Sequence, residues 1–299
     1  MRRKPRALMD LVVCVKQVPD PGCARVDPKT GTVVREGVKA VVNPLDLHAL
    51  EAAVSMREAS GGTVTAISMG PPGAAEALRE ALARGADNAI LISGKEFAGA
   101  DTLATAYALS LGIRKTGSYE LVICGRNSTD GDTGQVGPEI AEFLGTPHCT
   151  EVRKIREVGT DSVVVERAMD GWVEVVEMPL PGLLTVVREI NRPRLPSLRG
   201  LMKAKTAEIQ RLGAGDLNAD AARLGAPGSP TRVAESFQVA LGELGRSPAR
   251  GPGGGSSSEG SGAGEAAPEG PDCLLIEGSA REQARKLLRL LRESGVPAP

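Results

Sequence analysis

Aromatic residues are scarce in this sequence, which holds one Trp, two Tyr and three Phe among 299 residues. The formal net charge is −1, so there is no surplus of Lys and Arg to neutralise nucleic-acid phosphates. With few rings on which bases could stack, this composition argues against a nucleic-acid-binding protein. Long apolar runs are also missing, and the basic start leads directly into an alternating strand. Neither a signal peptide nor a transmembrane helix is therefore expected.

Reactive side chains are few and scattered. The only histidines, His48 and His148, stand neither in a metal-ligand spacing nor beside a recognisable nucleophile. The cysteines are odd in number and form no Cys-x-x-Cys pair; they are Cys14, Cys23, Cys124, Cys149 and Cys273. This pattern fits a reduced, cytoplasmic protein without an iron–sulfur or zinc site. No serine stands in a nucleophile elbow, so the sequence favours a carrier or binding module over an enzyme.

Strands and helices alternate over the first half of the chain. The predicted strands cover 11–18, 63–69, 88–92 and 121–124, with a hairpin turning at 27–31, and the predicted helices start after Asn43 and cover 74–83, 102–113 and 135–144. Short β-rich runs joined by helices of about ten residues or more predict an α/β domain. Its sheet is expected to be mostly parallel, doubly wound and covered on both faces.

The pattern changes after residue 150. Four shorter alternating runs over 150–188, separated by Gly, Asp and Pro, predict antiparallel strands that extend the same domain. The tail combines a Gly/Ser-rich stretch with an amphipathic helix that opens on a capping box of Ser279 and Glu282. The predicted organisation is an N-terminal extension (1–10), the α/β domain (11–205), a C-terminal arm (206–245), a flexible linker (246–271) and a C-terminal docking helix (272–299).

A glycine-rich segment follows the predicted strand 121–124 and opens the next helix. Glycines let the backbone approach a ligand, and the free amides at a helix start attract an anion. The segment is neither a Walker loop nor a Rossmann fingerprint, so an ordinary Asp/Gly-rich turn stays equally open on this pattern alone. A metal pair of Asp130 and Asp132 is disfavoured, because no third carboxylate or His stands nearby. The candidate ligand residues are Gly125, Arg126, Asn127, Ser128, Thr129, Asp130, Gly131, Asp132, Thr133, Gly134, Gln135 and Val136.

A second candidate is the helix start that runs from Asn43 through Pro44 and Leu45 to Asp46. Asn43 is expected as the N-cap, with Pro44 at the first helical position and Asp46 near the third. In a parallel sheet this start would face the same crevice as the glycine-rich segment. Helix capping alone also explains every one of these residues, so both interpretations stay open.

Residues 191–205 contain leucines that stand among arginines and lysines and are therefore expected to be exposed. Prolines exclude a regular helix before about Gly200. Leu195, Leu198 and Leu201 among basic residues favour a loop that docks a partner through a small apolar anchor. A basic loop packed on its own domain is the equal alternative.

Together these segments resemble the β-subunit of electron transfer flavoproteins. The match runs over about 11–205 and recurs in the final helix. It is carried by VVCVKQVPD (12–20), VNPLDLHALEAA (42–53), SMGPP (68–72), LARGAD (82–87), CGRNSTDGDTGQVGPEIAEFL (124–144) and EINRPRLPSLRGLMKAK (189–205). The resemblance implies an adenine nucleotide α-hydrolase-like fold and an electron carrier that is not itself an enzyme.

The resemblance also implies partners and a pocket. The expected complex is a heterodimer with a larger α-subunit that holds FAD. Electrons would come from dehydrogenases and go to a quinone oxidoreductase or to ferredoxin or flavodoxin, with indirect membrane association through such partners. The positions that match the family's nucleotide pocket are Cys14, Asn43 to Asp46, Met69, and Gly125 to Val136. The loop around Leu198 matches the family's recognition loop for dehydrogenases.

The family has two branches, which differ in the ligand of this pocket. Ordinary members hold AMP, and electron-bifurcating members hold a second FAD. Here the loop reads Asp-Gly-Asp-Thr over 130–133, where ordinary members tend to carry a run of acids. Gly131 removes bulk and charge where a larger ligand would extend, and 97–105 also resembles a segment of bifurcating members. FAD is favoured, with AMP as the alternative.

Two functions of other classes fit the sequence less well. A lone nucleotide-binding regulatory module would have no use for the Leu198 loop and the tethered helix. An adenylating enzyme would need a pyrophosphate-loop motif and a catalytic lysine, which the sequence does not show. The stretch 237–272 is longer and richer in Gly and Ser than the usual tail of the family.

Overall fold

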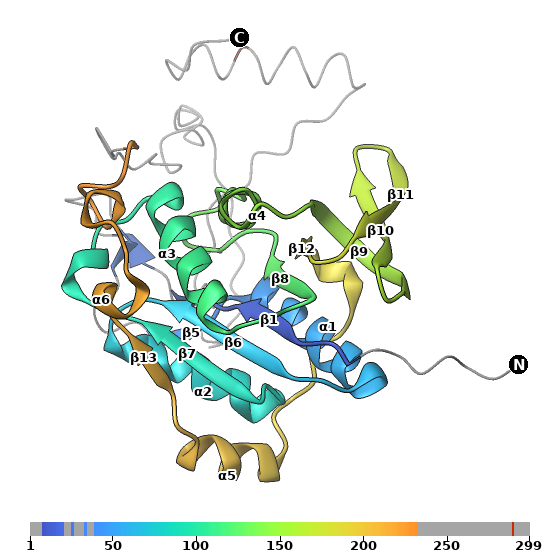
Figure 1. Ribbon diagram of the computed structural model, residues 1–299, viewed down its shortest axis with the longest axis horizontal. Coiled ribbons are helices and arrows are strands. Elements are labelled where there is room, and N and C mark those ends of the chain that lie inside the picture. The colour runs from blue at the N-terminus through green and yellow to red at the C-terminus, as the bar shows by residue number, and fades with distance from the viewer. Residues whose placement is uncertain (1–7, 21–24, 27–32, 35–38, 232–288, 290–299) are drawn as a thin grey trace, which may run out of the picture. The chain divides into compact units, whose positions relative to one another are not determined.

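The computed structural model describes residues 8–20, 25–26, 33–34, 39–231 and 289 (Figure 1). The predicted linker and, apart from Arg289, the predicted docking helix lie outside the described residues, so both stay predictions. No described helix combines the length and the apolar character that crossing a bilayer requires.

One large sheet organises the described residues. Its nine strands lie in the order β11-β10-β9-β12-β8-β1-β6-β7-β13. The parallel part consists of β1 (Leu11–Cys14), β6 (Val64–Met69), β7 (Asn88–Ile92), β8 (Leu121–Gly125), β12 (Gly182–Val186) and β13 (Gln210–Leu212). The antiparallel part consists of β9 (His148–Val158), β10 (Ser162–Met169) and β11 (Trp172–Pro179). The predicted α/β class, with a mostly parallel sheet and an antiparallel extension, is confirmed.

Helices cover both faces of this sheet. The helix α1 (Pro44–Ser60) and the helix α2 (Ala75–Arg84) pack on one face around Leu50 and Leu78. On the other face, α3 (Thr102–Lys115) and α4 (Val136–Leu144) pack around Ile113 and Ile140. Figure 1 shows α3 and α4 on one side of the strands and α2 with α5 (Leu198–Thr206) on the other. The doubly wound arrangement is therefore confirmed.

Smaller elements complete the described residues. They are β2 (Gln17–Pro19), β3 (Arg25–Val26), β4 (Val33–Val34), β5 (Ala40–Val42), α6 (Ala214–Leu217) and four 3-10 turns at Pro72–Ala74, Lys95–Phe97, Arg188–Ile190 and Ala221–Arg223. The strands β3 and β4 pair antiparallel on either side of the predicted hairpin turn, whose own residues lie outside the described ones. The strand β13 shows that the predicted arm contributes an edge strand to the sheet.

Local sequence explains where the central elements begin and end. The strands β1 and β8 are almost wholly apolar because neighbouring strands and both helix layers bury them. The side chain of Asp101 accepts a hydrogen bond from the amide of Ala104 and so caps α3. At the end of α4, Gly145 adopts the left-handed conformation (φ 71°) that closes many helices.

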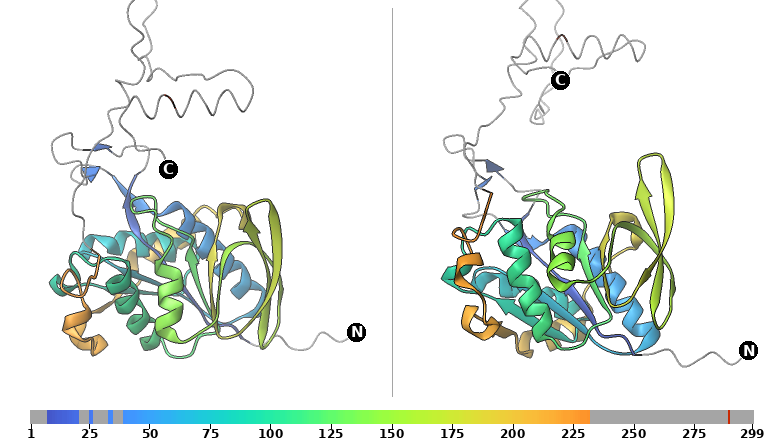
Figure 2. Two further views of the ribbon diagram at one scale, coloured as in Figure 1. Left: turned by 90° about the horizontal axis from the view of Figure 1, so that it is seen from above. Right: turned by 45° about the horizontal axis from the view of Figure 1, so that its top comes forward.

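Two strand predictions are wrong in detail. The strand expected over 11–18 divides, because the chain leaves the sheet after Cys14 and continues as β2, which pairs antiparallel with β5. The fourth run after residue 150 becomes β12, which is parallel to both β8 and β9. All five of its residues are buried, as expected for a central strand of a parallel sheet and not for a half-exposed antiparallel one. The hairpin of β10 and β11 does project from the sheet as an antiparallel extension (Figure 2).

The helix in the 191–205 segment also begins earlier than expected. It starts at Leu198, two residues before the predicted limit at Gly200. Ser197 is the N-cap, and its hydroxyl accepts a hydrogen bond from the amide of Gly200. Because Pro196 precedes this cap, its ring conflicts with no helical carbonyl, and the helix can start at once.

Candidate functional site

The strand order reverses at β1, and this reversal positions the candidate site. From β1 the chain moves outward through β6 and β7, and then returns to form β8 on the opposite side of β1. In open α/β sheets, ligands bind beyond the carboxyl ends of the strands at such a point. The segments that follow β1 and β8 are residues 15–16 and the β8–α4 loop (126–135). Both predicted sites, the start of α1 and the glycine-rich segment, lie at this edge.

Asn43 joins the start of α1 to the β8–α4 loop. Its side-chain amide donates a hydrogen bond to the carbonyl oxygen of Asn127 (2.9 Å), and its Oδ1 accepts one from the amide of Thr129 (3.2 Å). The residue is 1% exposed. It stands at the N-cap position with Pro44 next, as predicted, but its side chain makes no capping hydrogen bond to its own helix. The predicted N-cap position of Asn43 is therefore confirmed, while its side chain holds the loop 84 residues later in the chain in place of making a capping bond.

Asp46 ties together three parts of the site. Its carboxylate accepts hydrogen bonds from the amide of Lys16 (2.7 Å), from the Asn43 side chain (2.9 Å) and from the amide of Gly125. A Cβ atom at Gly125 would lie 2.4 Å from an Asp46 oxygen, so the close approach requires glycine. Burial raises the pKa of Asp46 to about 7, although these hydrogen bonds and the Lys16 charge act to lower it. The ends of β1 and β8 and the start of α1 thereby form one hydrogen-bonded unit.

Lys16 brings a positive charge to the loop. Its ammonium group lies 2.6 Å from an Asp130 oxygen and donates a hydrogen bond to the Ser128 hydroxyl (3.2 Å). The loop is folded on itself, with the Asp132 amide donating to the carbonyl oxygen of Ser128 (2.8 Å) and the Asn127 side chain donating to Asp132. Sequence analysis did not select Lys16. The signal that would have found it is the single cation that ends the apolar run of β1.

The start of α4 has the properties of an anion site. Its N-cap residue, Gln135, makes no side-chain capping bond, and the preceding residues 131–135 are exposed. The first amides of a helix have no partner within the helix and carry partial positive charge. With the Lys16 ammonium and the hydroxyl-bearing Ser128, Thr129 and Thr133 nearby in the loop, this donor set fits a pyrophosphate group.

The other predicted ligand residues lie at the same edge of the sheet with differing exposure. Cys14 ends β1 and is buried beside Cys124, whose thiol pKa is raised by contact with the Cys14 thiol and by burial. Met69 ends β6 and is half-buried. Arg126 continues the pairing of β8, because its amide donates to the carbonyl of Val186 (2.9 Å), and its side chain lies 3.4 Å from Glu151. Pro44 is exposed and Leu45 half-buried. Within the described residues, no three His, Cys, Asp or Glu side chains are grouped to hold a metal.

Comparison with known proteins decides the family. Residues 30–217, more than half of the chain, match the family described as "Electron transfer flavoprotein domain". The electron transfer flavoprotein subunit beta of Thermoanaerobacterium thermosaccharolyticum is 51% identical over 226 residues, covering 75% of this chain and 86% of the relative. The chain belongs to the electron transfer flavoprotein β-subunit family.

Two other relatives in this electron transfer flavoprotein family carry informative names. The electron transfer flavoprotein subunit beta of Clostridium acetobutylicum is 48% identical over 228 residues, covering 76% of this chain and 87% of the relative. A protein of Acetobacterium woodii named "Caffeyl-CoA reductase-Etf complex subunit CarD" is 45% identical over 230 residues, with 77% and 87% covered. The matched family domain includes the start of α1, the β8–α4 loop and the 191–205 segment, whereas Cys14 and Lys16 precede it.

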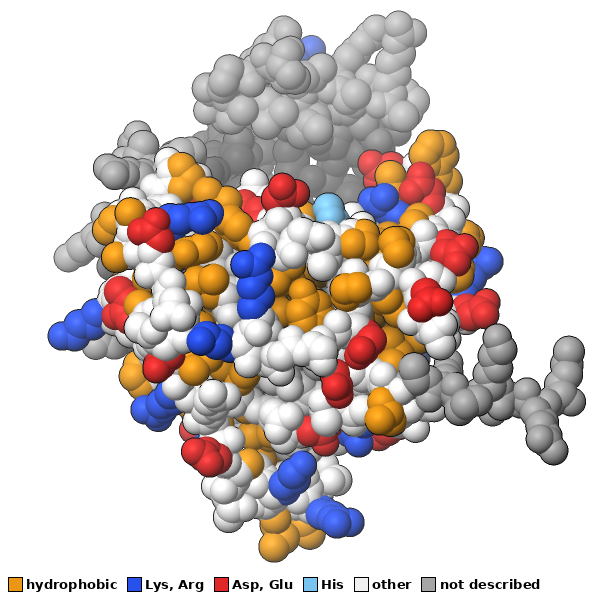
Figure 3. All heavy atoms as spheres, in the orientation of Figure 1, with side chains coloured by type: hydrophobic (Ala, Val, Ile, Leu, Met, Phe, Trp, Pro, Cys, Tyr) orange, Lys and Arg blue, Asp and Glu red, His pale blue; other side chains and the backbone are white. Residues whose placement is uncertain are grey.

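The 191–205 segment of this electron transfer flavoprotein β-subunit exposes its predicted leucines. Leu195, Leu198 and Leu201 are 83%, 77% and 44% exposed. Met202, which sequence analysis missed, is 65% exposed and follows Leu198 at helical spacing on α5. Figure 3 shows apolar side chains between basic ones at this end of the molecule, where Figure 1 places α5. Leu198 and Leu201 belong to α5 and Leu195 lies just before it, so none of the three is part of the β8–α4 loop.

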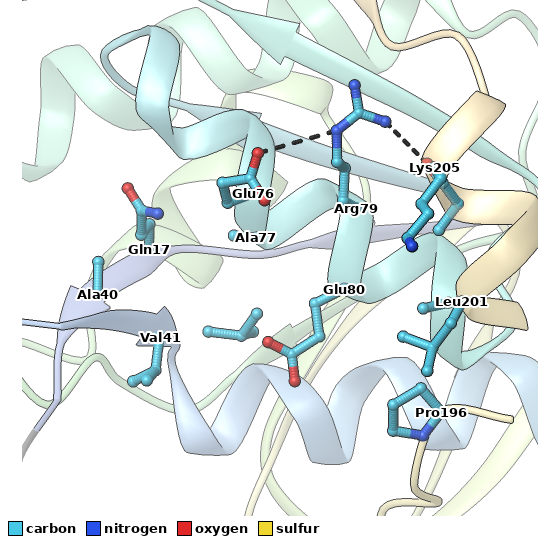
Figure 4. Close-up of a pocket in the computed structure, with 13 residues that line it drawn as sticks. Gln17, Ala40, Val41, Glu76, Ala77, Arg79, Glu80, Pro196, Leu201 and Lys205 are labelled. Carbon is cyan, nitrogen blue, oxygen red and sulfur yellow. Dashed lines mark hydrogen bonds and ion pairs between the residues drawn. The ribbon is translucent and has the colours of Figure 1, made fainter. Parts of the chain in front are cut away.

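A groove of about 390 Å³ lies beside the exposed leucines (Figure 4). Pro196 and Leu201 form one wall, and Glu76 and Glu80 of α2 and Val41 of β5 contribute to the rest. The residues that line the groove include none of the predicted nucleotide residues, although Val42 precedes Asn43 directly. Its position next to exposed apolar side chains is typical of a protein–protein contact surface.

Proposed function

We propose that this chain is the β-subunit of a heterodimeric electron transfer flavoprotein whose β-site holds a second FAD. In this proposal the complex works in the cytoplasm, accepts electrons from dehydrogenases and delivers them to a quinone reductase or to ferredoxin or flavodoxin. Electron bifurcation at the β-bound flavin would divide them between a high-potential and a low-potential acceptor.

The observation that carries the FAD assignment is the space at Gly131. A Cβ atom there would meet its nearest neighbour, the Ser128 hydroxyl, at 3.6 Å, which is ordinary contact. The backbone of Gly131 does not adopt the left-handed conformation that favours glycine. The fold therefore does not require glycine at this position, unlike Gly125. A ligand that extends past the loop between Asp130 and Asp132 accounts for the missing side chain.

The chain's own residues would bind and orient the nucleotide. The amides at the start of α4 and the Lys16 ammonium offset the negative charge of a pyrophosphate. Asn43 and Asp46 hold the loop and the strand ends in place, so the donors are arranged before the ligand arrives. A bound FAD supplies the redox chemistry, and the protein supplies its position and surroundings.

Relatives and surface features support the assembly. The names of the relatives describe subunits, and that of the Acetobacterium woodii protein describes a subunit of a reductase complex. In our proposal a larger α-subunit binds this chain, and Leu195, Leu198 and Leu201 dock dehydrogenase partners. Apolar anchors that protrude amid basic residues suit a partner with an apolar pocket and an acidic rim.

The cofactor content of the complex tests this proposal. The chain is produced together with its α-subunit, the nucleotides are released by acid, and they are quantified by chromatography. We expect two FAD per heterodimer. One FAD and one AMP would contradict the β-site assignment and would leave the family assignment intact.

A further inference from the structure

The helix α1 contacts both functional regions, and the inference below rests on the proposed function. Its first turn carries Asn43 and Asp46, which hold the β8–α4 loop. Its next turns carry His48, Glu51 and Glu58, which bind the start of the 191–205 segment. Glu51 follows Asp46 by five residues, which is about 8 Å along a helix. A single helix therefore connects the proposed nucleotide residues with the segment that carries the exposed leucines.

Arg194, which directly precedes the exposed Leu195, donates five hydrogen bonds to two carboxylates. Its backbone amide and Nε both donate to Oε2 of Glu51 (3.0 and 2.8 Å), and Nη2 donates to Oε1 (2.9 Å). The guanidinium also donates two hydrogen bonds to Glu58 (2.6 and 2.9 Å). We call these three residues the Arg194 cluster. A guanidinium between two carboxylates gives paired, geometrically fixed hydrogen bonds that a surface ion pair lacks.

Two further contacts fasten the same segment. The Asn191 side chain donates to the carbonyl oxygen of His48 (2.9 Å), and its Oδ1 lies 3.1 Å from Nδ1 of His48. The Arg84 side chain of α2 donates to the carbonyl oxygen of Arg194. The backbone is thus held from two helices immediately before Leu195. Pro196, which forms a wall of the groove in Figure 4, follows directly.

We propose that Arg194 is a positioning residue for partner docking. The Arg194 cluster joins this segment to α1 and so fixes the positions of Leu195, Pro196 and Leu198 relative to that helix. A dehydrogenase that docks on these residues is then held at a set place relative to the β8–α4 loop. A loop that already has its bound conformation loses little conformational entropy when the partner binds, and this favours association. Electron transfer also depends on a reproducible distance between donor and acceptor sites, which a mobile anchor would not provide.

The first test compares Arg194→Gln with Arg156→Gln in the heterodimer. Arg156 pairs with Glu166 at 2.7 Å on the antiparallel extension, so it controls for the loss of one arginine and one ion pair. The electron donor is a purified flavoprotein dehydrogenase, chosen from a panel as the one with the lowest KM for the wild-type complex. Arg194→Gln is expected to raise this KM about tenfold with kcat little changed. Arg156→Gln is expected to leave both unchanged.

The second test is a double-mutant cycle with Leu198→Ala. If Arg194 acts by positioning the anchor, adding Arg194→Gln to Leu198→Ala raises KM by no more than about twofold beyond the single variant. Glu58→Gln removes one of the two carboxylates that bind Arg194, and it does so at an exposed position. This variant provides the same test if Arg194→Gln folds poorly. Hydrogen exchange of the peptide 191–197 is expected to increase in both cluster variants.

The outcomes separate the two proposals. A KM that rises for Leu198→Ala but stays at the wild-type value for Arg194→Gln and Glu58→Gln would overturn the positioning role. Fully additive effects in the cycle would also overturn it. A KM unchanged by Leu198→Ala would instead contradict the docking surface of the proposed function.

Discussion

At the scale of single residues, Gly125 and Gly131 have opposite reasons to be glycine. Gly125 touches Asp46, and any side chain there would collide with the carboxylate and the start of α1. Gly131 has room for a side chain within its own loop. The first glycine is explained by the fold, and in our proposal the second makes room for a ligand.

We expect Gly131→Asp, which adds both bulk and charge, to change the bound nucleotide more than Gly131→Ala, which adds only a methyl group. The aspartate would add a third negative charge between Asp130 and Asp132, where a flavin-bearing nucleotide extends in our proposal. Acid release and chromatography of the heterodimer measure the result. The expected loss is about half of the FAD in the aspartate variant, because only the β-site is affected. Equal FAD content in both variants would show that position 131 does not face the ligand.

Asp46 predicts a pH dependence with a defined sign. Its folded-state pKa of about 7 lies above the ordinary value of 3.8, so between these values the folded chain binds a proton that the unfolded chain has lost. The contribution of this group to stability is therefore full below about pH 4 and falls as the pH rises to about 7.

Asp46→Asn removes this dependence and also removes an acceptor for the Lys16 amide. We expect a loss of about 1–3 kcal/mol in the free energy of unfolding, larger at about pH 5 than at about pH 7.5. Urea unfolding of the two forms at both pH values provides the measurement. A wild-type advantage that grows with pH would mean that the carboxylate is stabilised, not destabilised, by its surroundings.

At the scale of elements, local signals predicted most helices and strands, but pairing needed the structure. The helix starts after Asn43 and at Thr102 follow from residue patterns, as do the apolar strands β6, β7 and β8. The direction of β12 does not, because it depends on which strands become its neighbours. Likewise the sequence predicts Asn43 at the helix N-cap, but not the two hydrogen bonds that its side chain makes with residues more than 80 positions away. Lys16 was missed for the same reason, since Asp130 is 114 residues distant.

The helix α5 presents the proposed partner anchor, Leu198, at its first position. Leu198→Ala is expected to weaken electron transfer from a dehydrogenase by about tenfold or more in kcat/KM, as for a central interface anchor. Because Leu198 is 77% exposed and lies on α5, outside the β8–α4 loop, the nucleotide content is expected to stay at the wild-type value. Parallel assays of transfer rate and bound nucleotide check both parts. Loss of nucleotide in this variant would show that the segment serves the pocket and not a partner.

At the scale of the whole molecule, the described residues place two surfaces on one scaffold. The strand ends at the β1/β8 reversal gather the predicted nucleotide residues, and α5 presents the exposed Leu198 and Leu201. The helix α1 is bonded to both. The family assignment rests on sequence relatives that cover about three quarters of the chain, and the proposed second flavin rests on the loop between Asp130 and Asp132.

Reductive titration of the heterodimer tests the central claim most directly. Each FAD accepts two electrons, so a complex with redox-active flavins in both subunits takes up four electron equivalents from dithionite under anaerobic conditions. Our account predicts four equivalents, with bleaching of two flavins per heterodimer. Saturation at two equivalents would contradict it.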